Sequence, residues 1–137
     1  TNFPYRLRQS PGPLNALGEV KFMFPNPHNV YLHDTPTRGL FAQTRRDFSS
    51  GCVRVRDPLL LAEWVASDNP NMTPARLQAI AAGNDETRVS LPRAIPVHIL
   101  YWTVVLDSDT GVRFVDDVYD RDAVLIAALD SPPPPLE

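Results

Sequence analysis

Apolar positions along the 137-residue chain alternate in some stretches and cluster at helical spacing in others, which predicts both strands and helices. Two short strands are expected over residues 20–24 and 29–33, on either side of a proline-rich break. The longest β-like run covers residues 97–106 and is predicted to be a central strand. The turn at 107–111 leads from it into a further strand. These runs predict a core that is mainly β.

Helix start signals occur twice as an N-cap residue followed by proline, at Asp57-Pro58 and at Thr73-Pro74. A third helix is expected near the C-terminus with Asp120 as its cap. The helices accompany the strands rather than alternating with them. The pattern therefore predicts an α+β fold with a predominantly β core and peripheral helices.

Composition and charge narrow the classes of function. The pI near 5.5 and the lack of a basic cluster interleaved with aromatics argue against nucleic-acid binding. The lone Cys52 excludes an internal disulfide and a multi-cysteine metal site, and no metal or other cofactor is expected. Residues 1–60 carry a net charge of +4 and residues 61–137 carry −7. The basic half would attract a carboxylate-bearing substrate, although scattered surface charge is the simpler interpretation.

Cys52 is the first candidate for chemistry, because it follows the small residues Ser49, Ser50 and Gly51. Such a segment can turn sharply, so that the backbone N–H groups of Gly51 and Cys52 face a developing oxyanion. A thiol attacks as the thiolate and needs a base or a cation nearby.

Histidines occur at three positions, 28, 33 and 98, and His33 is best placed to act as that base because it ends a predicted strand before a turn. Arg54 points to the same side as Cys52 if the segment is extended, where it would hold a substrate carboxylate or favour the thiolate. The residues alone leave two interpretations open: a catalytic Cys/His pair, or a core cysteine with a structural histidine.

Two motifs resemble those of the L,D-transpeptidase catalytic domain, the YkuD-type fold. Residues 30–36 (VYLHDTP) resemble its histidine motif and residues 49–55 (SSGCVRV) its cysteine motif, with His33 and Cys52 separated by 19 positions. Ser50 stands where most members have a second histidine, which is generally not the principal base. Further stretches, at 5–18, 21–26, 96–103 and 117–122, resemble the larger, envelope-associated branch of the family.

This resemblance implies β-sandwich-like sheets of the YkuD type with peripheral helices. It implies a catalytic domain over residues 1–130 that lacks the family's first strands. Residues 131–137 are expected to be a proline-rich, disordered tail in which Leu136-Glu137 is a candidate cloning remnant. The missing strands raise the question of whether this chain is active by itself.

The resemblance also implies a mechanism. Cys52 would attack the carbonyl of the third residue of a peptidoglycan tetrapeptide stem and release D-Ala, with His33 as general base and then acid. The backbone N–H groups of Gly51 and Cys52 would form the oxyanion hole. The acyl group would pass to an amine of a second stem, so the implied partners are donor and acceptor stem peptides in the bacterial periplasm or cell envelope.

Supporting roles follow for four residues of the two motifs. Asp34 would orient His33 or end the strand, and the turn role is favoured. Arg54 would position the loop of its own motif, and Ser49 and Ser50 would bond to that loop or to His33. Three aromatic residues are expected to lie in the core rather than at the substrate: Tyr31, Phe41 and Trp102.

Two other functions remain open. An L,D-carboxypeptidase would share the acyl-enzyme and use water as the acceptor. A non-catalytic wall-binding module would keep the fold without the chemistry, but an intact set of His33, Cys52 and Arg54 argues against it. Carbapenems acylate the family's cysteine and would separate an active enzyme from such a relic.

Overall fold

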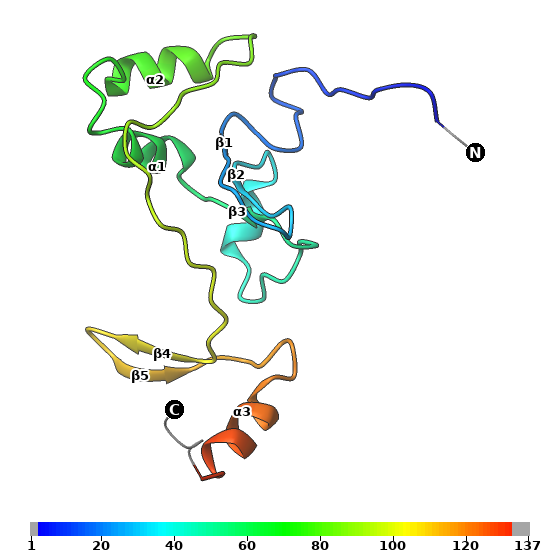
Figure 1. Cartoon of the computed structure of the whole chain (residues 1–137), viewed down its shortest axis with the longest axis vertical. Helices are drawn as coiled ribbons and strands as arrows, with labels where there is room; N and C mark the ends of the chain where they lie inside the picture. Colours follow the sequence, from blue (N-terminus) through cyan, green and yellow to red (C-terminus); the bar gives the residue numbers. More distant parts are fainter. Residues whose placement is uncertain (1–2, 133–137) are drawn as a thin grey trace. The chain divides into compact units, whose positions relative to one another are not determined.

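The computed structural model describes residues 3–132, which contain two small sheets, three α-helices and one 3-10 helix (Figure 1). The chain divides into two units, one ending at Val97 and the other beginning at His98. Strands and helices occur in both units, which confirms the mixed α+β class expected from the sequence. None of the helices within residues 3–132 is long and apolar enough to span a membrane.

The first unit contains a three-stranded sheet in the order β1-β2-β3. The pair β1/β2 is antiparallel and the pair β2/β3 is parallel, with Lys21, His33 and Arg54 opposite one another across the three strands. Residues paired in this way project from the same face of a sheet, so the register gathers these three side chains on one side. The elements are β1 (Lys21–Phe22), β2 (Leu32–His33) and β3 (Val53–Arg54), with the 3-10 helix η1 (Arg38–Ala42) between β2 and β3.

Two helices follow β3 and pack against each other, α1 (Pro58–Val65) and α2 (Pro74–Ala81). Both have proline in the first turn, as the start signals predicted. Thr73 caps α2, since its Oγ1 accepts the N–H of Arg76 at 3.3 Å. Asp57 occupies the cap position of α1 without a side-chain bond to the helix.

Burial in the first unit is concentrated in two places. The buried apolar residues lie on α1 and α2 or directly after α1, and they are Pro58, Ala62, Ala66 and Leu77. The other buried stretch is polar and follows β2, with His33 6 % exposed, Asp34 2 % and Thr35 3 %. Buried polar groups are stable only when they are hydrogen-bonded. The end of β2 is therefore held by specific bonds rather than by apolar packing.

The second unit contains the antiparallel hairpin β4 (Val104–Asp107) and β5 (Gly111–Phe114), followed by α3 (Asp122–Leu129). Asp117 ties this unit together, because its carboxylate accepts the Tyr101 hydroxyl at 2.6 Å and the Asp122 N–H at 2.7 Å. The second bond occupies one of the free N–H groups at the start of α3.

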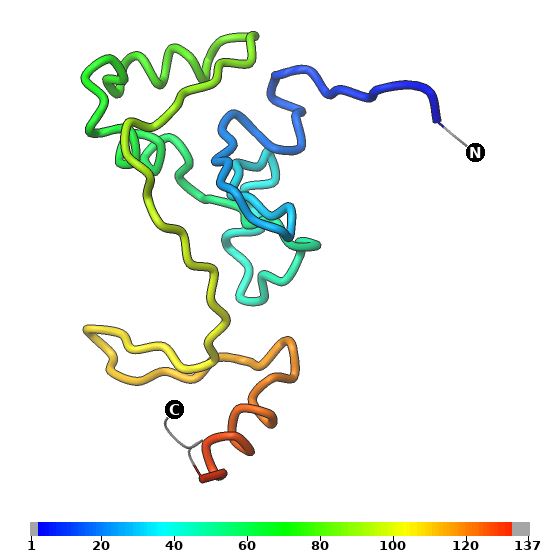
Figure 2. The backbone as a smooth tube through the Cα atoms, in the orientation of Figure 1, coloured from blue at the N-terminus to red at the C-terminus, as the bar shows by residue number. Residues whose placement is uncertain are grey.

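Several boundaries differ from the sequence-based expectation. The strand predicted over 97–106 begins only at Val104, and the chain from α2 to β4 forms neither helix nor strand (Figure 2). Trp102, expected in the core, is 69 % exposed. Arg121, not Asp120, is the N-cap residue of α3. Most of the predicted proline-rich tail, residues 133–137, lies outside the described residues.

Candidate active site

The two motifs meet at the parallel pair β2/β3. Val53 N–H donates to the Tyr31 carbonyl at 3.0 Å, and Val55 N–H donates to the His33 carbonyl at 2.8 Å. Leu32 lies opposite Val53, so the register sets Tyr31 beside Cys52 and His33 beside Arg54. Alternation along each strand then brings Tyr31, His33 and Cys52 to one face of the sheet.

The Cys52 side chain contacts Tyr31. A hydrogen bond between these side chains is the largest cause of a Tyr31 pKa above its ordinary value, and burial and the charge of Cys52 act in the same direction. The Tyr31 ring also meets the His33 ring edge to face, with centroids 5.8 Å apart. Tyr31 was predicted to be a core residue, but it is only half-buried and its side chain contacts both Cys52 and His33. Tyr31 precedes His33 by two residues, and residues with this spacing in a strand share a face. The spacing is therefore the sequence signal that places Tyr31 at the candidate site.

The orientation of His33 is fixed by the main chain. Its Nδ1 is hydrogen-bonded to the backbone carbonyl of Asp34. A carbonyl oxygen can only accept, so Nδ1 carries the proton and Nε2 of the neutral ring has a free lone pair. The imidazole therefore has the tautomer that a general base needs. Within residues 3–132 the structure contains no direct hydrogen bond between His33 and Cys52.

Asp34 holds this carbonyl in place without touching His33 through its carboxylate. Oδ1 accepts from Arg38 Nη2 at 2.9 Å, and Oδ2 accepts the Glu19 N–H at 2.9 Å. The Asp34 N–H in turn donates to the Val20 carbonyl at 2.8 Å. Each polar group of this buried residue thus contributes to the turn after β2, and the turn sets the position of the imidazole.

The turn before Cys52 is closed by Ser49, whose hydroxyl donates to the Cys52 carbonyl and accepts the Gly51 N–H at 3.2 Å. Gly51 has φ of +143°, a conformation that residues with a Cβ rarely adopt. Arg54 Nη1 donates to the Phe48 carbonyl at 3.3 Å and so ties β3 to the start of this loop.

The N–H groups of Cys52 and Gly51 differ in whether they are free to bind an oxyanion. The Cys52 N–H has no hydrogen-bond acceptor among the residues described, whereas the Gly51 N–H is already engaged by Ser49. The Ser50 side chain likewise has no hydrogen-bond partner there. These contacts favour Cys52 N–H over Gly51 N–H as an oxyanion donor.

The chain matches the L,D-transpeptidase catalytic domain (YkuD) over residues 1–99. The chain belongs to this family. The matched region includes the whole first unit and all the candidate site residues, whereas all but the first two residues of the second unit lie beyond it.

A relative from Haemophilus influenzae, named "Putative L,D-transpeptidase", is 38% identical over 120 residues. The alignment covers 88% of this chain and 24% of that protein, so the chain spans about a quarter of the relative's length. The likeness therefore extends past the YkuD match into the second unit.

In this L,D-transpeptidase-family chain, two surface hollows lie beside α1 and share Trp64 in their walls. One, of about 350 Å³, is lined on its other side by residues 93–96, and the other, of about 610 Å³, by Phe41, Arg46 and residues 55–57. Neither contains His33 or Cys52, so the candidate site lies outside these two hollows. No grouping of His, Cys, Asp or Glu suited to a metal ion occurs within residues 3–132.

Proposed function

We propose that this protein is a peptidoglycan L,D-transpeptidase with Cys52 as its nucleophile. The observation that carries the proposal is the shared sheet face of Tyr31, His33 and Cys52, in which the imidazole has its Nε2 lone pair available. Membership of the family supports the reaction class. The donor that we propose is a tetrapeptide stem.

In the first step Nε2 of His33 takes the proton of the Cys52 thiol, and the sulfur attacks the carbonyl carbon of the third stem residue. Collapse of the tetrahedral intermediate breaks the amide bond to the terminal D-Ala. The imidazolium returns the proton to the leaving amine, and a thioester remains on Cys52. Short-range movement of Cys52 on its turn brings the thiol to Nε2, since catalytic hydrogen bonds are often long before substrate binds.

In the second step an amine of an acceptor stem attacks the thioester. His33 removes a proton from this amine and gives it to the departing Cys52 sulfur, so a new amide bond forms and the thiol is restored. If water were the acceptor, the same enzyme would act as an L,D-carboxypeptidase.

The surrounding residues support these steps in different ways. The Cys52 N–H stabilises the oxyanion, a contribution of about 3–4 kcal/mol in comparable sites. The Gly51 N–H joins it only when its bond to Ser49 opens. Asp34 positions His33, and Arg54 and Ser49 hold the loop that presents the nucleophile. Ser50 forms part of the same loop.

The substrate sets the cellular location that we propose, the periplasm or cell envelope, because peptidoglycan lies outside the cytoplasmic membrane. The reaction would contribute to wall biogenesis and cell shape. An activated thiol that accepts acyl groups would also make the protein a carbapenem target.

The first experiment measures the intact mass of the protein after incubation with a carbapenem, for the parent and for Cys52→Ala. We expect one acyl adduct on the parent and none on the variant. The same pair is then incubated with a purified tetrapeptide stem. Release of D-Ala with a crosslinked dimer supports transpeptidation, and release without a dimer identifies a carboxypeptidase. A folded parent that gains no adduct and releases no D-Ala would contradict the proposal.

A further inference from the structure

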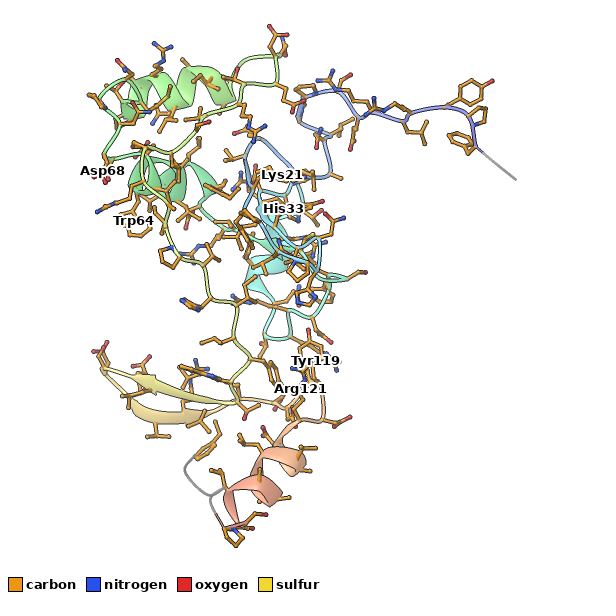
Figure 3. All side chains as sticks on the ribbon, viewed as in Figure 1. Lys21, His33, Trp64, Asp68, Tyr119 and Arg121 are labelled. Atoms are coloured by element: carbon orange, nitrogen blue, oxygen red, sulfur yellow. The ribbon has the colours of Figure 1, made fainter. Side chains whose placement is uncertain are left out.

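Lys21 is the single lysine of the chain, and its ammonium lies beside the candidate active site. Nζ is 3.6 Å from the centroid of the Tyr31 ring, the residue that bonds to Cys52. The register pairs Lys21 with His33, so both side chains project from the same sheet face, where Figure 3 shows them close together. A positive charge therefore lies beside His33 and over the ring of Tyr31.

No carboxylate of residues 3–132 pairs with this charge, because Lys21 takes part in none of their ion pairs. The buried acid that follows His33 in the chain, Asp34, is bonded to Arg38 and to the Glu19 N–H. Contact with the face of an aromatic ring orients an ammonium but does not neutralise it. An ammonium has three N–H donors, so Lys21 keeps donors for an incoming anion.

The strand order decides which part of a substrate meets Lys21. His33 lies on the central strand β2, with Cys52 and β3 on one side and Lys21 and β1 on the other. The acyl carbon must lie at Cys52, and the leaving amine must lie at His33. The remainder of the leaving D-Ala then extends toward β1, and its only charged group is its carboxylate.

We propose that Lys21 binds the terminal carboxylate of the donor stem and so selects stems that end in a free acid. This inference rests on the proposed transpeptidase function and assigns the donor specificity of the same site. The charge-assisted bond positions the leaving residue so that its amine faces His33. Its loss weakens the reaction of acid-ended stems and leaves amide-ended stems unaffected.

Binding can be measured without turnover in the Cys52→Ala variant. Reductive methylation with carbon-13 formaldehyde labels Lys21 and the α-amino group alone, because the chain has no other lysine. We expect a tetrapeptide stem with a free terminal carboxylate to shift the Lys21 methyl resonance. The same stem with a terminal carboxamide should leave that resonance in place.

Kinetics test the same contact in the active protein. The parent is expected to release D-Ala from the acid stem with a kcat/KM about tenfold above that for release of D-Ala amide from the amide stem. Lys21→Met should remove this preference, and Lys21→Arg should keep most of it. Arg76→Met on α2 is the matched control, since it removes one positive charge away from the sheet face and should keep the preference.

The outcomes separate the two proposals. Equal shifts of the Lys21 resonance by both stems, or an unchanged acid preference in Lys21→Met, would overturn the role of Lys21 while D-Ala release still supports the transpeptidase. If the parent released neither product from either stem, the proposed function would fail and the inference about Lys21 would fail with it.

Discussion

Gly18 lies against the carboxylate of Asp34 so closely that a Cβ on Gly18 would clash with Oδ2. Gly18 also has φ of +64°, in the left-handed region where a side chain adds strain. Because the Asp34 carbonyl holds His33, this close approach connects the segment before β1 to the catalytic candidate. The glycine lets the buried carboxylate reach the Glu19 N–H.

Gly18→Ala should therefore destabilise the protein and impair the site. We expect a loss of at least about 2 kcal/mol in the free energy of unfolding, from left-handed strain together with a clash against buried atoms that cannot move freely. Gly39→Ala is the matched control, because its Cβ would meet no atom within 4 Å and its φ is not positive. Urea unfolding of both variants measures the difference, and an equal effect of the two would refute the argument.

Arg38→Met tests whether the ion pair with Asp34 supports catalysis through the turn after β2. Asp34 is buried while the Arg38 side chain is 53% exposed, so the variant should lose about 1–2 kcal/mol of stability. Its rate of carbapenem acylation should also fall because the Asp34 carbonyl is no longer held. Arg8→Met removes a pair with Glu86 in which both side chains are exposed, and should cost no more than about 1 kcal/mol. Acylation at wild-type rate in a folded Arg38→Met protein would show that the turn keeps its position without the pair.

The two motifs that make up the candidate site were found from the sequence, and the structure brings them together because each forms a short strand and the two strands pair. The catalytic roles of His33 and Cys52 stay predictions. The anchoring of Asp34 was not predictable, since its partners come from two segments: Gly18 and the Glu19 N–H lie before β1, and Arg38 lies in η1. The role of Tyr31 was missed for a related reason. An aromatic residue in a strand is usually packed in a core, and only the register with β3 shows that it contacts the thiol.

The helices were predicted better than the strands. Proline at the first turn and a capping residue before it are local signals, and both α1 and α2 begin where these signals stand. The run at 97–106 is rich in β-forming residues, but only its end at Val104 finds a partner strand, in β5. Strand formation depends on such a partner, which composition alone does not reveal. The expectation of one catalytic domain over 1–130 stays a prediction.

His33→Gln should lower the rate of Cys52 acylation by about 10²–10⁴-fold, the usual contribution of a general base. Glutamine retains polarity and a similar reach but cannot take up the thiol proton. His28→Gln is the matched control, because His28 is exposed and its backbone N–H, which bonds to Asn26, is unaffected. The measurement is the time course of the acyl adduct by mass spectrometry. Equal rates in the two variants would exclude His33 as the base.

The contact between Tyr31 and Cys52 has a spectroscopic consequence. The hydrogen bond to Cys52 is the main cause of the raised Tyr31 pKa, so Cys52→Ala should bring the pKa of Tyr31 down toward its ordinary value. Alkaline titration of tyrosinate absorbance measures this shift. The contribution of Tyr31 is isolated by subtracting the curve of Tyr31→Phe, made once in the parent and once in Cys52→Ala. An unchanged difference curve would mean that the two side chains are not bonded.

In the second unit, the start of α3 should become less stable at low pH. The pKa of Asp117 lies below its ordinary value, first because the Asp122 N–H bonds to its carboxylate and next because the Tyr101 hydroxyl does. A carboxyl whose pKa is lowered by folding stabilises the native state above its unfolded pKa of about 3.9. That stabilisation is lost as the pH falls through the lower native value.

Hydrogen exchange of the Asp122 amide, followed from neutral pH to below pH ~4, tests this expectation once the intrinsic pH dependence of exchange is removed. Protection should be constant near neutrality and should decrease at the acid end in the parent. In Asp117→Asn the protection should be low at every pH, since the neutral amide is a weaker acceptor than a carboxylate. Asp116→Asn, next to it in the chain, should keep the parent's profile. Protection that persists in acid with Asp117 intact would show that the carboxylate does not hold the helix start.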